Sequence, residues 1–220
     1  RENWIVLETS TNNQFRFTFP GLSVEEKAII ELIDDIKAFA PTYIVASGSL
    51  PPGLPPYFYG LIVKTANALG AKCIVDTSGE ALEALRGRNA FLIKPNIGEL
   101  CKLLGKDYID KADVPHAARQ VLHDGFAEMA AVSMGPLGAW LVTKSEQFFA
   151  PAPEVPKRST VGAGDSMVAG ITYMLQKGGN LLDAISMGVA CGSAATMNEG
   201  SQLFNAEDAR RLYHEVRQNV

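Results

Sequence analysis

The chain has 220 residues, of which 47% are hydrophobic and 20% charged, and its net charge is −4 at pH 7. This length and composition suit one α/β domain with a substantial core. The negative charge and the lack of a Lys/Arg run argue against a nucleic-acid-binding surface, and no apolar run reaches membrane-spanning length. We expect no signal peptide. Cysteines 73, 101 and 191 lie in apolar segments, which favours reduced thiols and a cytoplasmic location over disulfides.

The first predicted element is a β-hairpin. Residues 3–9 and 14–19 are strand-like and flank the polar turn 10–13. Phe15, Phe17 and Phe19 alternate, so they are expected on one face of the second strand. Because the chain opens inside a strand and without Met, we expect further residues before Arg1 in the intact protein.

The rest of the chain alternates between helical and strand-like patterns. Ser23 and Glu26 fit a capping box, which predicts a helix that continues to about Phe39. Further helices are predicted after Pro55 and Pro56 to near Gly70, and over residues 80–85, 97–104, 115–124, 164–177, 181–197 and 206–218. Strands are predicted over residues 43–46, 72–75, 91–93 and 129–133, with 139–143 and 147–150 as an antiparallel edge hairpin. The alternation predicts a mostly parallel sheet with helices on both faces.

Polar clusters follow four of these strands. They are residues 47–49, 76–78, 94–96 and 133–135, and each lies where a parallel strand ends. Ligands of open α/β sheets bind beyond the carboxyl ends of the strands. The shared placement of the clusters therefore indicates one site at this edge of the sheet.

Residues 159–167 form the most informative segment, because they hold Gly162, Gly164 and Asp165 at a predicted helix start. The glycines allow close backbone approach, and N–H groups at a helix N-terminus bind anions. The segment has two interpretations. Asp165 either caps a helix after an ordinary turn, or accepts the proton of a hydroxyl that attacks a phosphoryl group.

Residues 94–99 also allow two interpretations. Asn96 and Glu99 have the spacing of a capping box, in which each side chain binds the other residue's backbone N–H. Alternatively, they organise Mg²⁺ through water while Lys94 faces phosphate, since Mg²⁺ keeps several waters and few carboxylate ligands. Residues 133–138 fit a tight turn between strands, and the small residues of 188–196 fit close helix packing.

Together, the Asn96-x-x-Glu99 segment and residues 159–167 resemble motifs of the ribokinase-type (PfkB-type) carbohydrate kinases. The resemblance covers essentially the whole chain and implies a ribokinase-like three-layer α/β/α sandwich with a mostly parallel sheet and part of a small β lid. Residues 1–20 would be the lid remnant and residues 21–220 the ATP-binding kinase domain without its N-terminal strands. The family normally carries roughly ninety further residues. Their absence puts the activity of this chain alone in doubt.

The resemblance also implies a role for individual residues. Asp165 would be the general base, and the N–H groups of Gly162, Ala163 and Gly164 would hold the developing negative charge. Arg1, Ser49 and Asp165 would contact the sugar phosphate, and Asn96 and Glu99 would organise Mg²⁺ through water. The implied ATP neighbours are Lys94, Asn96, Ser133, Gly135, Gly138, Lys157, Val189 and Ser193. The implied monovalent-cation loops, with K⁺ as the candidate ion, contain Ser159, Val161, Asn198 and Gly200.

The function implied by the resemblance is ATP-dependent phosphorylation of fructose 6-phosphate at its C1 hydroxyl, a glycolytic step. Tagatose-6-phosphate kinase and 1-phosphofructokinase activities are the alternatives within the same branch. A nucleotide-binding fragment without turnover is the alternative of another class. A dinucleotide-dependent dehydrogenase is disfavoured, because no strand is followed by Gly-x-Gly-x-x-Gly. The apolar face of the hairpin predicts a homodimer formed through the lid.

Overall fold

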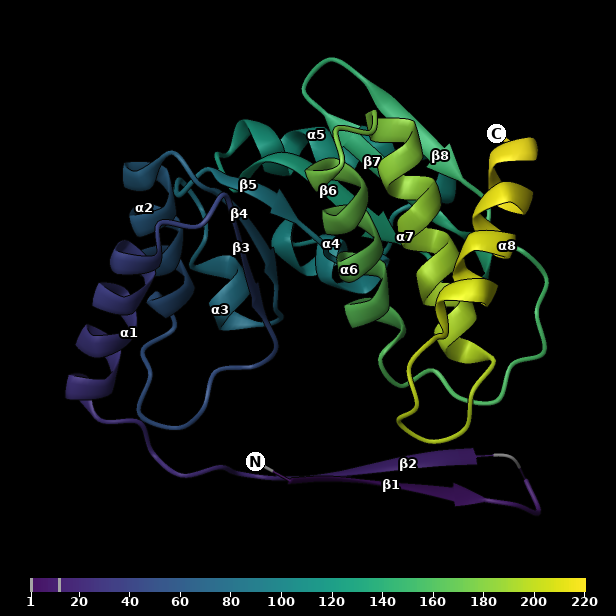
Figure 1. The fold of residues 1–220 in the computed structure, drawn as a ribbon, viewed down its shortest axis with the longest axis horizontal. Helices are drawn as coiled ribbons and strands as arrows, with labels where there is room; N and C mark the ends of the chain where they lie inside the picture. The colour runs from purple at the N-terminus through teal and green to yellow at the C-terminus, as the bar shows by residue number, and fades with distance from the viewer. Residues whose placement is uncertain (1, 12) are drawn as a thin grey trace.

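The computed structural model, which describes residues 2–11 and 13–220, contains a six-stranded and a two-stranded sheet. In the larger sheet the strands lie side by side in chain order from β3 to β8 (Figure 1). The first four are parallel: β3 (Tyr43–Ser47), β4 (Lys72–Asp76), β5 (Ala90–Ile93) and β6 (Ala127–Ser133). The last two, β7 (Ala139–Thr143) and β8 (Gln147–Ala150), are antiparallel, which confirms the predicted edge hairpin.

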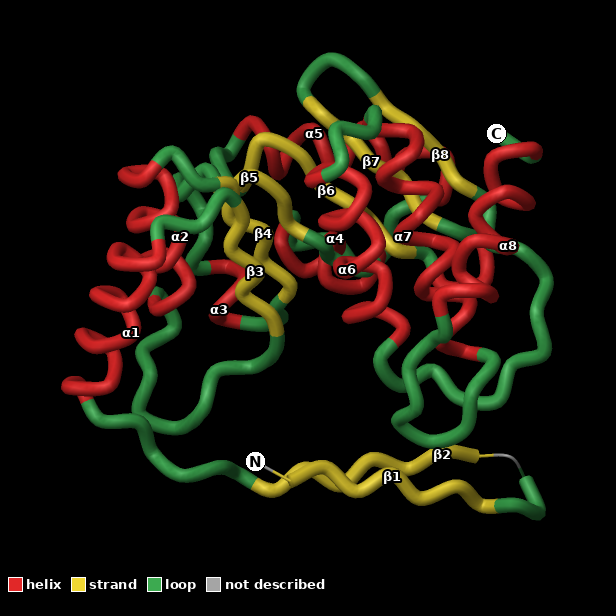
Figure 2. Tube along the Cα trace, in the orientation of Figure 1, coloured by secondary structure: helices red, strands yellow, loops and turns green. Residues whose placement is uncertain are grey.

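Helices cover both faces of this sheet, so the predicted three-layer α/β/α sandwich is confirmed (Figure 2). Alternate strand residues point to opposite faces, so Val75 and Ile93 belong to one core while Ile74 and Leu92 belong to the other. The first core is covered by α1 (Glu26–Phe39), α2 (Phe58–Leu69), α3 (Glu80–Glu83), α4 (Ile97–Leu103) and α5 (Val114–His123). The second is covered by α6 (Ala163–Gln176), α7 (Leu181–Thr196) and α8 (Ala206–Gln218). Two short 3-10 turns, η1 (Lys111–Asp113) and η2 (Gly135–Leu137), complete the fold.

Helices α6 and α7 approach closely through glycines. A Cβ on Gly170 would lie 2.7 Å from the carbonyl oxygen of Met187, and one on Gly192 would lie 3.1 Å from that of Ala163. The close packing expected of residues 188–196 is therefore confirmed. It also anchors the first residue of α6 against α7.

The small sheet is the predicted hairpin, formed by β1 (Glu2–Glu8) and β2 (Asn13–Phe19). It extends beneath the loops at the carboxyl ends of the large sheet (Figure 1). Trp4 pairs with Phe17 and Val6 with Phe15, so large apolar side chains share one face. These side chains are exposed, and Thr18, on the opposite face, lines a cavity of the sandwich. The apolar face of the hairpin therefore points away from the large sheet.

One predicted helix start is wrong. Helix α1 begins at Glu26, and its N-cap residue Glu25 makes no side-chain capping hydrogen bond. The backbone N–H of Val24 donates to the carbonyl of Pro52 at 3.0 Å, and the Ser23 hydroxyl lies 2.5 Å from where a Cβ on Gly53 would be. Residues 23 and 24 are thus held against the loop after β3 instead of starting the helix.

The expectation of reduced, buried cysteines is confirmed in the part of the chain that the structure describes. Cys73, Cys101 and Cys191 are free and buried. No helix within residues 2–11 and 13–220 has the length and apolar character required to cross a membrane.

Candidate active site

The N-terminus of α6 offers backbone N–H groups to an anion. Its N-cap, Gly162, has φ of 74° and no side chain, and the first intrahelical hydrogen bond runs from the Ser166 N–H to the Gly162 carbonyl at 2.8 Å. The N–H groups of Ala163 and Gly164 precede that bond and have no intrahelical acceptor. Such uncapped N–H groups and the helix dipole form an anion-binding site.

Gly162 is required at this point for two reasons. Its positive φ is rarely adopted by other residues. In addition, the Cδ2 atom of Leu203 lies 2.6 Å from where a Cβ on Gly162 would be. The loop before α8 therefore packs directly against the start of α6.

Asp165, in the first turn of α6, is exposed, and its Oδ1 accepts a hydrogen bond from the Ser47 hydroxyl at 3.1 Å. Ser47 ends β3, where it pairs with Asp76 of β4. The fold therefore brings the carboxyl end of the large sheet to the helix that carries Asp165. Asp165 therefore faces the carboxyl end of the sheet. A general base would need this orientation to reach a ligand bound at that end.

Lys94 and Asp76 form a buried ion pair beside this helix start. The Lys94 Nζ lies 3.2 Å from Asp76 Oδ1, and the two side chains are 8% and 16% exposed. The same Nζ is 3.4 Å from where a Cβ on Gly164 would be, so the ammonium adjoins the anion site. Burial raises the pKa of Asp76, Lys94 opposes this rise, and Asp165 and Glu99 add to it. The ion pair therefore lies in the field of two further carboxylates, a charge balance that favours an additional cation.

The capping interpretation of Asn96 and Glu99 is confirmed. Asn96 Oδ1 accepts from the Glu99 N–H at 2.9 Å, and Glu99 Oε2 accepts from the Asn96 N–H at 2.8 Å, so the two side chains close the start of α4. Within residues 2–11 and 13–220, no three His, Cys, Asp or Glu side chains are placed to bind one metal ion directly. The donor set also fits a Mg²⁺ held mainly through water, as the family resemblance implies, since Glu99 retains a second carboxylate oxygen.

The residues predicted to border the nucleotide are only partly brought together. Ser133 donates its N–H to the Pro95 carbonyl at 3.0 Å and forms a parallel bridge with Asn96. The η2 turn, with Gly135 and Gly138, follows Ser133 directly. In the second helical layer, Val189 is buried in the core, Ser193 is half-buried and Lys157 lies exposed in the loop before α6. The role of these residues toward ATP stays a prediction.

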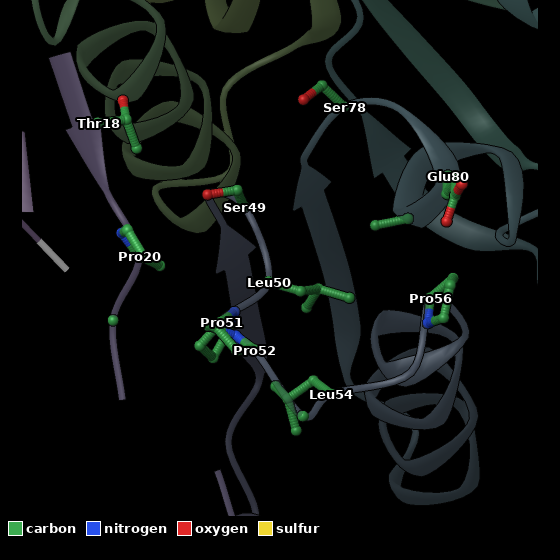
Figure 3. A pocket seen from close by; sticks show the side chains of 13 residues that line it. Thr18, Pro20, Ser49, Leu50, Pro51, Pro52, Leu54, Pro56, Ser78 and Glu80 are labelled. Carbon is green, nitrogen blue, oxygen red and sulfur yellow. The ribbon is translucent and has the colours of Figure 1, made fainter. Parts of the chain in front are cut away.

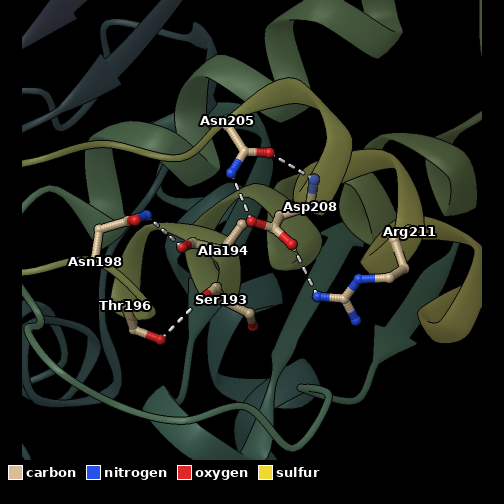
Figure 4. Close-up of polar contacts among 7 residues, drawn as sticks. All are labelled: Ser193, Ala194, Thr196, Asn198, Asn205, Asp208 and Arg211. Carbon is tan, nitrogen blue, oxygen red and sulfur yellow. Dashed lines mark hydrogen bonds and ion pairs between the residues drawn. The ribbon is translucent and has the colours of Figure 1, made fainter.

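The two loops predicted to bind a monovalent cation lie against each other. The Ser159 hydroxyl donates to the Gly200 carbonyl at 2.8 Å and accepts from the Val161 N–H at 3.2 Å. The Asn198 side chain donates to the Ala194 carbonyl at 3.2 Å, which fastens its loop to the end of α7 (Figure 4), and it also donates to the Leu203 carbonyl at 3.1 Å. These contacts hold the loop of Ser159 and Val161 against the loop of Asn198 and Gly200, and the binding of a monovalent cation there stays a prediction.

A cavity of about 650 Å³ opens beside the loops that follow β3 and β4 (Figure 3). Ser49 and Ser78 line it together with Thr18 from the hairpin, and the loop of Leu50 to Pro56 forms an apolar wall. Glu80 is the one charged residue among the described lining residues. None of the described lining residues supplies the positive charge expected beside a sugar phosphate. Arg1, predicted for that role, lies outside the described residues.

Three contacts at this site were not foreseen from the sequence. They are the hydrogen bond from Ser47 to Asp165, the ion pair of Asp76 with Lys94, and the packing of Leu203 on Gly162. Ser47 and Asp76 did stand out as polar residues at strand ends. Leu203 gave no signal, because nothing in a loop sequence marks what it packs against.

Known relatives in sequence carry kinase names. The protein named ATP-dependent 6-phosphofructokinase isozyme 2 of Escherichia coli is 37% identical over 215 residues, which are 97% of this chain and 70% of that protein. The protein of the same name from Mycobacterium tuberculosis is 32% identical over 215 residues, and this chain spans 63% of its length.

Solved structures agree. The crystal structure of E. coli phosphofructokinase-2 in complex with potassium matches with a TM-score of 0.91 at 36% identity and covers 99% of this chain, which spans 71% of that one. Thermotoga maritima ribokinase, at 20% identity and a TM-score of 0.74, covers 96% of this chain, which spans 69% of that one, and shares the fold. The family described as pfkB family carbohydrate kinase matches residues 1–208. The chain therefore belongs to the pfkB family of carbohydrate kinases.

Proposed function

We propose that the intact protein is an ATP-dependent kinase that phosphorylates fructose 6-phosphate at its C1 hydroxyl. The family membership and the names of the relatives support a sugar kinase of the phosphofructokinase type. The observation that carries the proposal is the placement of the Asp165 carboxylate in the same helical turn as uncapped N–H groups. An anion site with a base beside it suits transfer of a phosphoryl group to a hydroxyl.

In the proposed reaction, Asp165 accepts the proton of the C1 hydroxyl, and the hydroxyl oxygen forms the new bond to the γ-phosphorus. The bond from that phosphorus to the bridging oxygen of ADP breaks, and ADP keeps the electron pair. The N–H groups of Ala163 and Gly164 stabilise, by hydrogen bonding, the negative charge that develops on the transferred phosphoryl group. Lys94, whose ammonium adjoins Gly164, adds a full positive charge at the same place.

Two ions complete the proposed site. Asn96 and Glu99 would hold Mg²⁺ through water, and bound Mg²⁺ would neutralise the phosphates. The loops of Ser159 and Gly200 would hold K⁺, a proposal supported by their mutual contact and by the potassium complex of the E. coli relative.

We also propose that the protein acts as a homodimer joined through the hairpin. Trp4, Val6, Phe15, Phe17 and Phe19 share one exposed face that points away from the large sheet. Such a face is costly to leave in water, and a second copy offers an apolar face of the same shape. The occupant is thus a second hairpin packed face to face.

The sugar substrate is tested by comparing kcat/KM of the intact protein for fructose 6-phosphate, tagatose 6-phosphate and fructose 1-phosphate with MgATP. We expect the highest value for fructose 6-phosphate. In the same assay Asp165→Asn should lower kcat by about 10²–10⁴-fold while nucleotide affinity is kept. Near-normal turnover of this variant would remove Asp165 from the base role. ATP binding without turnover on all three sugars would favour the nucleotide-binding alternative.

A further inference from the structure

One side-chain hydrogen bond connects the end of β3 to the start of α6. The Ser47 hydroxyl donates to Asp165 Oδ1 at 3.1 Å, although the two residues are 118 positions apart in the chain. An exposed aspartate in the first turn of a helix is otherwise free to rotate toward its own N–H groups. The hydrogen bond instead holds this carboxylate toward the carboxyl end of β3.

Ser47 can hold Asp165 because its own backbone is fixed. Its carbonyl accepts from the Tyr59 hydroxyl at 3.2 Å, and the next carbonyl, of Gly48, accepts from Tyr59 at 3.0 Å and from Thr77 at 2.8 Å. The Gly48 N–H donates to the Asp76 carbonyl at 2.8 Å. Both hydroxyl donors belong to buried residues, one in α2 and one after β4. The turn after β3 is thus tied to two neighbouring elements, and Ser47 moves with them.

We propose that Ser47 is a positioning residue for the phosphoryl-transfer reaction, which fixes the orientation of the Asp165 carboxylate; this rests on the proposed kinase function. With Oδ1 engaged by Ser47, Oδ2 is left to accept the proton of the sugar hydroxyl. Ser47 itself neither gives up nor takes a proton in the reaction. Its effect is to hold the accepting oxygen where the hydroxyl arrives, and misplacement of about 1 Å in such a geometry can cost about 10²-fold in rate.

The test compares Ser47→Ala, Ser47→Thr and Asp165→Asn in the intact protein with MgATP and the best of the three sugar phosphates. Ser47→Ala should lower kcat about 10- to 100-fold with both KM values within about twofold of wild type. Ser47→Thr keeps a hydroxyl and should recover most of kcat. Adding Ser47→Ala to Asp165→Asn should cause no further loss, because Ser47 acts only through Asp165. Ser145→Ala, in the exposed turn between β7 and β8, is the matched control and should leave kcat unchanged.

The possible failures are distinguishable. If the wild-type protein turns over and Ser47→Ala has the same kcat, the positioning role is overturned and the kinase function is left intact. An equal loss in the wild-type and Asp165→Asn backgrounds would also overturn it, since Ser47 would then act on something other than Asp165. Absence of wild-type turnover with all three sugar phosphates would refute the kinase function itself, and the positioning role with it. Circular dichroism of each variant checks that the fold is kept.

Discussion

Replacing Lys94 by Met tests how much the buried ion pair of Lys94 with Asp76 contributes to the stability of the fold. The side chains are similar in size, so the main change is loss of the ammonium 3.2 Å from Asp76 Oδ1. Breaking a buried ion pair by removing one partner typically costs about 3–5 kcal/mol. Because Asp76 is 16% exposed, we expect the lower end, about 3 kcal/mol at neutral pH. For a chain of this size that corresponds to a fall in Tm of about 6–12 °C.

The stability that Lys94→Met loses should be larger at high pH than at low pH. The pKa of Asp76 is already raised by burial, and removal of Lys94 takes away the charge that opposes the rise. A carboxyl whose folded pKa lies above its unfolded pKa makes the native state bind the proton more tightly. Its effect on stability is therefore most favourable at low pH and is lost as pH rises through the folded pKa. The deficit of Lys94→Met should be full at pH 8 and should shrink as the pH falls and Asp76 becomes protonated.

Urea denaturation followed by circular dichroism at several pH values measures this deficit. Asp76→Asn/Lys94→Met is the matched control, because a neutral amide needs no cation, and it should regain most of the lost stability. A deficit that is equal at pH 8 and pH 4.5, together with a double variant as unstable as Lys94→Met, would refute the assignment of the cost to an unpaired Asp76 carboxylate.

Three further predictions concern the loop before α6, the metal and the lid. Gly162→Ala should lower the free energy of unfolding by more than the roughly 1–2 kcal/mol that a non-glycine residue costs in the left-handed region. The loss should also exceed that of Gly178→Ala, where φ is similar but no atom crowds the added Cβ. Equal urea midpoints for the two variants would contradict the close packing of Leu203 on Gly162. Glu99→Gln can still cap α4, so stability should hold while activity falls and recovers with added Mg²⁺; an unchanged Mg²⁺ titration would count against metal binding. Phe17→Glu should give monomers in analytical ultracentrifugation, whereas Thr18→Glu on the opposite hairpin face should stay dimeric; two dimers would exclude the apolar face as the interface.

Much of the fold could be predicted because its signals are local. Two short, mostly apolar runs identified the hairpin of β7 and β8 with its observed bounds, and the spacing of Asn96 and Glu99 identified the capping box of α4. Ser23 shows the limit of the same reasoning. Its hydroxyl could cap a helix, but the backbone N–H of its neighbour Val24 donates instead to a carbonyl in the loop after β3. No local sequence pattern predicts this contact.

The sequence by itself determined which residues could do chemistry: Asp165 at a glycine-rich helix start, and polar side chains at the ends of parallel strands. Only the tertiary structure decided which of them meet. It joined Ser47 to Asp165, paired Lys94 with Asp76 and packed Leu203 on Gly162. Helix and strand periodicity reflects neighbours a few residues apart, whereas these contacts depend on how the sheet and its helical layers pack. The orientation of Asp165, the proposed general base, therefore depends on how β3 packs against α6.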